Sequence, residues 1–546
     1  MNLAQRRLLA PALAVLVALP VMAATACSNR TGPTGKPPAA ADMVSMTPSG
    51  DREIESVRWL LGSEPSSIDW IYSYDYPPNS VLSNVCESLL RIDADFTVQP
   101  NLAEKVTNPD PLTYVYSLRQ GVTFHDGTPM TADDVVFSLK RHMDPGAGSY
   151  WATAFARVKD VAATGTAEVT VKLSAPDALF NQMMAVVPGI VESKAYVTAK
   201  GKNYGGPDGG VGCTGPFQLS KWTKGQSITL TRAENYWDPT RKAKAKSFEL
   251  VIVSDPTTQL NALTTGEVDG TYGPPVEGRQ KLLDSGIGKL YFGPTTSTVN
   301  FIVNDFTGPL KDVRIRKALW LAIDREGLIK AAYKGRAEAS RAVAAKLTWG
   351  GAPDVYRTAY DALPEPKQNL DQAKQLVAEV GAPAEPIVVA ISSSPVFAPL
   401  ANEMKAAGER IGLKVELKTI APDQYGSLFG GAEARKDIDL FFTSWYADIA
   451  DALQIYQNWE SKSFANYGKY SNPQYDELYA RALSESDPVK RAELVVQLQK
   501  ITVDDMVWLP IVNGPNSVFM NNRISGAPAT NAYLYYPWAA QIGGTK

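Results

Sequence analysis

Length is the feature that most limits what this chain can fold into. A single hydrophobic core stops growing at about 250–300 residues, and the chain has 546 residues. We therefore expect two or three domains. The composition is that of a globular protein, with 45% hydrophobic and 20% charged residues, and it excludes both a disordered chain and a bundle of membrane helices.

Charge and residue usage exclude several functions. The net charge is -3 and no basic stripe recurs along the chain, which argues against a nucleic-acid partner. Histidine and cysteine are scarce (His125, His142, Cys27, Cys86 and Cys213), and none shows the spacing of metal ligands. A nucleophile activated by histidine would need one of these two histidines. We therefore predict no catalytic residue, metal or cofactor, although chemistry run by carboxylates alone stays open.

Residues 1–26 are typical of a signal peptide. Two arginines precede an apolar run over 8–24, which contains two prolines and is too short for a comfortable membrane span. The run ends in Ala-Thr-Ala before Cys27, a pattern that resembles the lipobox of bacterial lipoproteins, although Ala24 stands where Leu is usual. The resemblance implies lipidation of Cys27 and anchoring to the outer face of the cell membrane. The alternative is an ordinary secretory signal with an incidental cysteine.

The segment that follows the signal is predicted to be a tether. Residues 27–51 are rich in Pro, Gly, Thr, Ser and Ala, which favours a flexible chain. No later stretch reaches the roughly 18 apolar residues of a membrane helix. If Cys27 carries lipid in an oxidising compartment, Cys86 and Cys213 remain. These two either form a disulfide or stay as buried free thiols.

Strand and helix patterns alternate along the rest of the chain. Alternation of apolar and polar residues predicts strands at 56–61, 114–118, 168–173, 227–231, 247–253, 387–392, 414–419 and 437–444. Helical spacing predicts helices at 80–90, 131–141, 312–333, 369–380, 398–411, 473–485 and 488–506. This order favours an α/β fold with largely parallel sheets.

Six motifs occur in a fixed order over nearly the whole mature chain. They are ESLLRID at 87–93 with PNLAE at 100–104, LRQGVTFHDGTPMTADDVVFS at 118–138, TGPF at 214–217 with RAENYW at 232–237, GEVDG at 266–270, VRIRKAL at 313–319 and WYAD at 445–448. Together they resemble the extracellular solute-binding proteins of the oligopeptide/dipeptide/nickel class (family 5) of bacterial ABC importers. Each motif alone is weak, whereas the ordered set is specific.

The resemblance implies a two-lobed periplasmic-binding-protein fold with an additional inserted domain and a ligand cleft between the lobes. Lobe I is expected at 52–96, 174–293 and 509–546, the inserted domain at 97–173 and lobe II at 294–508. Crossing strands near 293–294 and 510 would join the lobes. Closure about this hinge would enclose the ligand.

The resemblance also implies a binding site. In peptide-binding members an Asp after a Trp pairs with the ligand's α-ammonium group, and these positions are Asp448 and Trp445 here, with Tyr446 between them. A desolvated ammonium group needs such a carboxylate. The alternative is that Asp448 caps a turn or a helix start. Tyr74 and Tyr76 are expected to border the cleft, or else to serve in packing.

One departure from the family pattern concerns the other end of a peptide. Some members place an Arg a few residues before the Trp to hold a peptide carboxylate, but residues 441–444 are Phe, Phe, Thr and Ser. The C-terminal anchor of tripeptide binders is therefore absent from this stretch. Longer peptides, amidated or cyclic peptides and solutes other than peptides all stay open.

Import of a peptide is the function that these patterns favour. We expect a monomer that delivers its ligand to the transmembrane subunits of an ABC permease and is not an enzyme. The alternatives are import of an oligosaccharide, an opine or a metal chelate, or an envelope scaffold or regulator that has lost transport. A secreted glycosidase would need two acids at a matched distance, which a sequence cannot show.

Overall fold

The computed structural model describes residues 43–393 and 397–545. The chain divides into two compact units, Met1–Gly35 and Lys36–Lys546. Every helix and strand given below belongs to the second unit. Within the described residues, no helix is long and apolar enough to cross a membrane.

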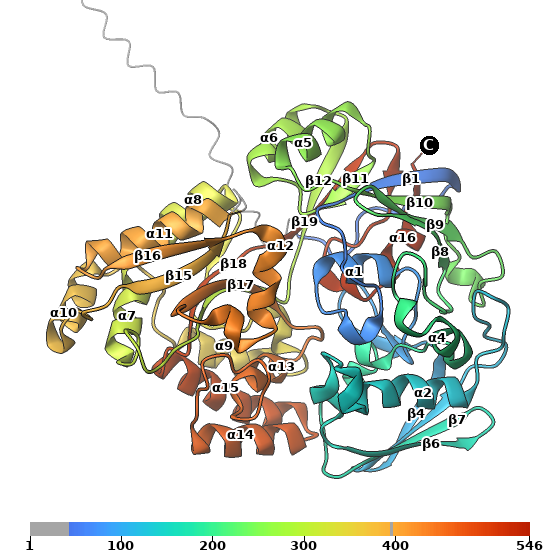
Figure 1. Cartoon of the computed structure of the whole chain (residues 1–546), viewed down its shortest axis with the longest axis horizontal. Helices are drawn as coiled ribbons and strands as arrows, with labels where there is room; N and C mark the ends of the chain where they lie inside the picture. The colour runs from blue at the N-terminus through green and yellow to red at the C-terminus, as the bar shows by residue number, and fades with distance from the viewer. Residues whose placement is uncertain (1–42, 394–396, 546) are drawn as a thin grey trace, which may run out of the picture. The chain divides into compact units, whose positions relative to one another are not determined.

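Lobe I is built on a seven-stranded sheet in the order β12-β19-β11-β1-β10-β9-β8 (Figure 1). Its strands are β1 (Ile54–Leu61), β8 (Phe217–Thr223), β9 (Ser227–Arg232), β10 (Ala245–Ile252), β11 (Gly270–Tyr272), β12 (Gly288–Gly293) and β19 (Asn516–Asn521). Strand β1 runs parallel to β10 and β11, and the remaining pairs are antiparallel. Trp59 on β1 is fully buried, with its ring centre 4.8 Å from that of Trp538.

Lobe II is built on a six-stranded sheet in the order β14-β18-β13-β17-β15-β16. Its strands are β13 (Ser297–Val303), β14 (Glu338–Ala339), β15 (Ile387–Ser392), β16 (Val415–Ile420), β17 (Leu440–Tyr446) and β18 (Trp508–Asn513). Strand β15 is parallel to β16 and β17, whereas β13 pairs antiparallel with β17 and β18. Both sheets are therefore mixed, and the expectation of largely parallel sheets is wrong, because β8, β9 and β10 form antiparallel pairs within lobe I and the strands at the crossings between the lobes also pair antiparallel.

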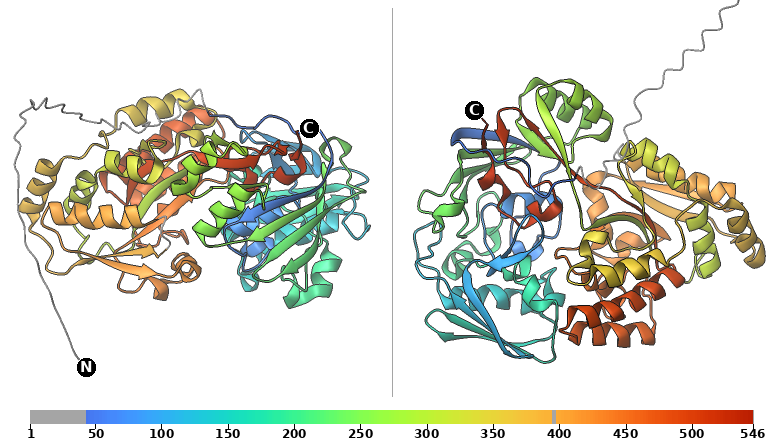
Figure 2. Two further views of the ribbon diagram at one scale, coloured as in Figure 1. Left: turned by 90° about the horizontal axis from the view of Figure 1, so that it is seen from above. Right: turned by 180° about the vertical axis from the view of Figure 1, so that it is seen from behind.

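Helices surround these sheets. Those of lobe I and the inserted domain are α1 (Tyr76–Leu82), α2 (Ala132–Met143), α3 (Phe180–Met183), α4 (Lys194–Lys200), α5 (Pro256–Thr265), α6 (Arg279–Asp284) and α16 (Trp538–Gln541). Those of lobe II are α7 (Val313–Ala322), α8 (Arg325–Tyr333), α9 (Pro353–Asp361), α10 (Leu370–Val380), α11 (Ala398–Arg410), α12 (Pro422–Tyr425), α13 (Leu453–Tyr456), α14 (Pro473–Ser484) and α15 (Pro488–Asp504). Both views in Figure 2 show the two groups side by side.

Two helix predictions need correction. The helix expected over 312–333 is two helices, because Ile323 is extended and Asp324 starts α8 by accepting the Gly327 N–H at 2.8 Å. Only 80–82 of the helix expected over 80–90 is helical, because α1 begins at Tyr76 and ends at Leu82. Asp75 caps it and two prolines fix its first turn, the position where a missing N–H does no harm.

An antiparallel sheet in the order β4-β5-β7-β6 forms the centre of the inserted domain. The strands are β4 (Ala103–Asp110), β5 (Thr113–Leu118), β6 (Val158–Gly165) and β7 (Glu168–Leu173). Helix α2 packs against β6 and β7, and Thr131 and Asp134 form a capping box at its start. The turn before it has Gly127 at φ 85°, a conformation that favours glycine, and Asp126 accepts the Thr128 N–H at 2.9 Å.

The chain crosses between the lobes twice. Strand β12 of lobe I continues into β13 of lobe II through 294–296, and β18 of lobe II continues into β19 of lobe I through 514–515. The predicted boundary at residue 509 thus falls inside β18, and the crossing comes after Asn513. Gly293 permits a close approach at the first crossing, since a Cβ there would lie 2.4 Å from backbone atoms of Ala529.

The predicted tether ends earlier than residue 51. Ser45 accepts the Ala529 N–H at 2.8 Å, and the Thr47 N–H donates to Ala527 O at 3.1 Å. Thr47 is also 5% exposed. These backbone bonds dock the segment from Val44 onward against the C-terminal part of lobe I. Residues 1–42, with the predicted signal peptide and Cys27, lie outside the described residues.

Cys86 and Cys213 are bonded to each other in the structure. Next to them, the buried carboxylate of Glu87 accepts hydrogen bonds from Thr214 Oγ1 at 2.9 Å, Tyr236 Oη at 2.7 Å and Trp237 Nε1 at 2.7 Å. Residues from the motifs at 87–93, 214–217 and 232–237 therefore meet at one acid. The role of these residues here is to join segments far apart in the sequence.

Breaking the disulfide should destabilise lobe I. The cysteines are 127 residues apart, and closing a loop of that length removes denatured-state entropy equivalent to about 4–5 kcal/mol. We expect the Cys86→Ser, Cys213→Ser double variant to melt several degrees below the parent protein in differential scanning calorimetry. A reductant should reproduce the loss in the parent and leave the double variant unchanged. Equal melting temperatures would contradict the prediction.

Candidate functional site

Asp448 lies just past the end of β17, in the loop that leads to α13. Its side chain is 8% exposed. Gln454 on α13 holds it from two sides, because Gln454 Nε2 donates to the Asp448 carboxylate while Gln454 Oε1 accepts the Asp448 N–H at 2.8 Å. Position and orientation of the carboxylate are thus fixed within lobe II.

Lobe I reaches the same carboxylate through Tyr535. The hydroxyl of Tyr535 donates to Asp448 Oδ1, and Tyr535 belongs to the C-terminal segment that follows β19. Contacts nearby also join the lobes, since Gln454 Nε2 lies 3.6 Å from the sulfur of Met183. Asp448 is therefore shared by both lobes.

The electrostatics of Asp448 are unusual for a buried acid. Burial raises the pKa of its carboxyl to about 6, and hydrogen bonds from Tyr535 and Gln454 offset only part of that rise. No Lys, Arg or His within 43–393 and 397–545 forms an ion pair with it. An ionised carboxylate in this position has neutral hydrogen-bond partners and lacks a countercharge.

Capping of a helix start, the alternative role considered for Asp448, is carried out by Asp451. It pairs with Arg491 at 3.1 Å, accepts a hydrogen bond from Gln182 at 3.3 Å and accepts the Leu453 N–H at 3.0 Å at the start of α13. Its charge and its capping capacity are therefore used within the fold. Asp451 therefore caps α13 and forms an ion pair, whereas Asp448 does neither within the described residues.

Tyrosines from both lobes surround the approach to Asp448. Tyr446 Oη donates to the backbone oxygen of Tyr74 at 3.1 Å, and its ring centre lies 5.1 Å from that of Tyr76. Tyr74 stacks on Tyr150 at 4.3 Å. Burial raises the pKa of Tyr76 to about 12, so its hydroxyl stays neutral near pH 7. These side chains offer neutral donors and apolar ring faces to a ligand.

Trp445 points elsewhere. Successive residues of a strand face opposite sides of the sheet, so Trp445 and Tyr446 diverge. The Trp445 ring centre lies 5.4 Å from that of Trp508, and 6.3 Å from those of Phe429 and Tyr467. Of the five predicted ligand-binding residues, the structure brings together Asp448, Tyr446, Tyr74 and Tyr76 and places Trp445 in an aromatic cluster of lobe II.

Three residues near Asp448 were not predicted from the sequence. They are Gln454, Tyr535 and Tyr150. Gln454 follows Asp448 by only six residues, so a polar residue at a helix start was a usable clue. Tyr535 is separated from Asp448 by 87 residues. Tyr150 lies within the inserted domain expected at 97–173, and its N–H donates to Ile71 O of lobe I at 2.9 Å. Only the fold brings Tyr535 and Tyr150 to the carboxylate.

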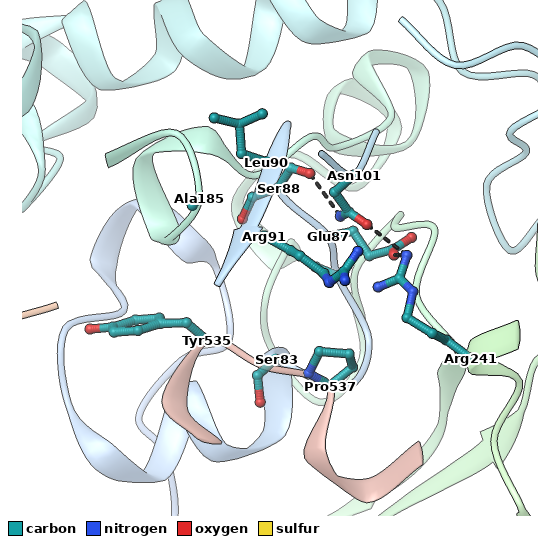
Figure 3. Close-up of a pocket in the computed structure, with 11 residues that line it drawn as sticks. Ser83, Glu87, Ser88, Leu90, Arg91, Asn101, Ala185, Arg241, Tyr535 and Pro537 are labelled. Atoms are coloured by element: carbon teal, nitrogen blue, oxygen red, sulfur yellow. Dashed lines mark hydrogen bonds and ion pairs between the residues drawn. The ribbon is translucent and has the colours of Figure 1, made fainter. Parts of the chain in front are cut away.

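Two hollows lie away from Asp448. A cavity of about 10 Å³ adjoins Glu87, Arg241 and Asn101, and Figure 3 shows the Tyr535 ring extending away from these three side chains. Its volume suits about one water, so it excludes a solute. An open groove of about 450 Å³ runs beside Trp237, within lobe I and the inserted domain. In the described part of the chain, no cluster of three or more His, Cys, Asp or Glu side chains is placed to hold a metal ion.

A two-lobed α/β body with an inserted domain, two crossing segments and a buried carboxylate shared between the lobes defines a solute-binding protein. Comparison with known families agrees. The model of the bacterial extracellular solute-binding proteins, family 5, matches residues 97–467. The chain belongs to this family, which serves ABC importers.

Individual relatives share the whole length of the fold. The periplasmic oligopeptide-binding protein OppA of Salmonella typhimurium is 26% identical over 504 residues, covering 87% of this chain and 90% of OppA. The solved structure of the periplasmic binding protein DppA of Helicobacter pylori with the peptide STSA has a TM-score of 0.81, 22% identity and coverage of 91% and 99%. AgaA of A. tumefaciens with agropinic acid has a TM-score of 0.77, 20% identity and coverage of 90% and 98%. These structural similarities establish the fold.

The raised pKa of Asp448 predicts how its carboxyl affects stability. Its folded-state pKa of about 6 exceeds the unfolded value of about 3.9, so the group favours the folded state below pH 4 and loses that effect as the pH rises through 6. Asp448→Asn should therefore gain stability relative to the parent between pH 4 and 7, on the order of 2 kcal/mol. Urea unfolding across this range measures the difference. The exposed Asp354→Asn variant is the control, and an equal pH trend in both variants would contradict the prediction.

Proposed function

We propose that the protein captures a peptide between its lobes by pairing the peptide's α-ammonium group with Asp448. The protein then delivers the peptide to an ABC import permease. The observation that carries this proposal is the buried carboxylate that has two neutral donors and no countercharge. An ammonium group supplies the missing charge and additional donors, and charge-assisted hydrogen bonds of this kind are about twice as strong as neutral ones.

The surroundings of Asp448 favour an amine attached to a chain. Tyr446, Tyr74 and Tyr76 supply ring faces and hydroxyls on both sides, which suits the mixed apolar and polar surface of a peptide. Phe441 and Phe442 are buried in β17, so this strand offers no cation for a peptide carboxylate. Recognition is therefore proposed to rest on the amino end, with the carboxyl end free to vary. This supports peptides over the alternative solutes.

Binding also involves closure of the lobes. Asp448 belongs to lobe II and Tyr535 to lobe I, so a ligand that contacts both groups favours the closed arrangement over an open one. A ligand shifts such an equilibrium only by its difference in affinity for the two states. Because Tyr535 of lobe I bonds to Asp448 of lobe II, an ammonium group that contacts both residues stabilises the closed state relative to the open one.

The amine-binding role of Asp448 can be tested with peptide pools. Residues 28–546 retain every described element and would be melted with di- to decapeptides, oligosaccharides and metal chelates. A ligand at a hundred times its Kd adds about 2.7 kcal/mol. We expect a shift with peptides that disappears when the peptide amine is acetylated. A shift with sugars or chelates alone would reject the peptide and keep solute import.

Substitution of Asp448 should abolish this binding selectively. Losing one partner of a buried charge pair removes 2 kcal/mol or more, so Asp448→Asn should raise Kd at least about 30-fold. Isothermal titration measures the change, with Asp354→Asn as the control. Because the ionised carboxylate is the binding form, the affinity of the parent should also fall as the pH drops below about 6. Undiminished binding by Asp448→Asn would exclude the ammonium pairing.

Membrane attachment through Cys27 completes the proposal. It rests on the Ala-Thr-Ala-Cys sequence at 24–27 and on the short segment between Cys27 and the docked residues that begin at Val44. We expect Cys27→Ser to move the protein from the membrane fraction to the soluble fraction and to abolish incorporation of a labelled fatty acid. Unchanged fractionation and labelling would instead support attachment that does not use this thiol.

A further inference from the structure

The first crossing between the lobes is flanked by arginines from both of them. Phe292 is the penultimate residue of β12 and is 7% exposed. Arg279 at the start of α6, in lobe I, places its guanidinium carbon 5.9 Å from the Phe292 ring centre. Arg336 follows α8 in lobe II and places its guanidinium carbon 4.5 Å from the same ring centre. Two cations from different lobes thus converge on one ring at the hinge.

Neither arginine has a countercharge in the described part of the chain. Arg279 donates to Ser517 Oγ at 3.0 Å and to Pro274 O at 3.4 Å, both neutral acceptors. The guanidinium of Arg336 makes no hydrogen bond or ion pair with a described residue and lies over the ring of Phe292. Glu277, the acid that acts electrostatically on Arg279, is exposed and forms no ion pair with it.

Several other arginines with little exposure are paired with acids, whereas the buried Arg316, Arg325 and Arg435 donate to backbone carbonyls. Arg141 pairs with Asp69 at 2.7 Å and with Glu192, Arg241 pairs with Asp238 at 2.7 Å, and Arg491 pairs with Asp451 at 3.1 Å. The hinge pair differs from both groups, because Arg336 has no acceptor among the described residues, and burial together with the charge of Arg336 lowers the pKa of Arg279 to about 10. Two like charges in a partly desolvated position disfavour the arrangement unless an anion accompanies them.

We propose that Arg279 and Arg336 form a binding site for a phosphate oxyanion at the hinge. The planar guanidinium fork matches phosphate oxygens, and two such groups can hold one phosphate. Tyr333 lies beside the site, because its side chain packs at Gly514 on the second crossing and interacts electrostatically with Arg279. Its hydroxyl is a further donor for the anion.

The bound phosphate group would belong either to a free phosphate ion or to the headgroup of an anionic membrane lipid. The N-terminal segment meets the body at this place, since the Val44 N–H donates to Phe292 O at 2.9 Å. A chain anchored at residue 27 would therefore hold the hinge face within reach of the membrane surface, because 16 residues extend at most about 3.3–3.6 Å each. The site itself does not depend on which solute occupies the cleft.

A phosphate at this site would couple to solute binding. Because one arginine comes from each lobe, the anion connects the lobes and stabilises the arrangement in which the two guanidinium groups are near Phe292. By linkage, an anion that favours this arrangement raises the affinity for any solute that favours it, and the solute raises the affinity for the anion equally.

The site is tested by titrating inorganic phosphate into residues 28–546 at constant ionic strength, with chloride as the compensating anion. We expect saturable binding by calorimetry that is at least tenfold weaker in Arg336→Gln and in the Arg279→Gln, Arg336→Gln double variant. Arg357→Gln, whose side chain is 62% exposed on lobe II, should bind like the parent. Arg336→Gln loses no hydrogen bond to a described residue, so its fold, checked by circular dichroism, should be intact even where the double variant is not.

A second experiment, with lipid vesicles, distinguishes a free phosphate ion from a lipid headgroup. The parent and the double variant are sedimented with vesicles of phosphatidylglycerol and of phosphatidylcholine. If the parent binds free phosphate and the double variant also loses phosphatidylglycerol binding, the lipid headgroup is the source of the phosphate. If only the affinity for free phosphate falls in the double variant, the free ion is the ligand. Equal phosphate affinity in the parent, Arg336→Gln and the double variant, or no saturable binding to either source, would overturn the proposal.

Discussion

One buried carboxylate is the point at which the two lobes meet in the candidate site. Asp448 has given up most of its hydration and receives hydrogen bonds from a tyrosine of lobe I and a glutamine of lobe II. Neutral donors offset only part of the free energy of burying a charge. No charged partner among the described residues offsets the remainder, and the proposed pairing with a positively charged ligand rests on this.

Three other buried acids are paired with arginines, whereas Asp177 and Asp439 instead accept backbone N–H groups. Glu192 pairs with Arg141, Asp451 with Arg491 and Asp269 with Arg523. In each of these pairs the charge is neutralised by the protein itself, and the acid joins segments of one lobe or packs helices together. Removing one partner of such a pair would leave a buried charge. Asp448 is held by Tyr535 and Gln454 and has no charged partner among the described residues.

A disulfide and hydrogen bonds to a buried acid hold the scaffold of lobe I together. The disulfide between Cys86 and Cys213 and the hydrogen bonds to Glu87 tie three distant segments of lobe I together. Within residues 43–393 and 397–545, the strands of the two lobes are connected at 294–296 and 514–515. Motion that admits a solute is thus concentrated at two short segments, and groups near them, such as Arg279 and Arg336, are placed to influence it.

Much of the fold was accessible from the sequence, because it rests on local rules and on an ordered set of motifs. The capping box at Thr131 and the turn at Gly127 were readable from adjacent residues, and the motifs gave the family and the approximate lobes. The failures have local physical causes. Asp324 caps a second helix where one long helix was expected, and β18 completes the sheet of lobe II beyond residue 509. Segment 44–47 docks through backbone bonds that composition does not reveal.

The sequence by itself determined the class of protein, because the family depends on residue types in a recognisable order, and it predicted Asp448, Tyr74 and Tyr76 as site residues. The tertiary structure alone decided that Asp451 is neutralised and Asp448 is not, that Tyr446 and Trp445 diverge, and that Tyr535 meets Asp448 from the other lobe. Whether a charge is paired depends on which side chains the folded chain brings within a few ångströms. Residues 87 positions apart carry no local signal of that proximity.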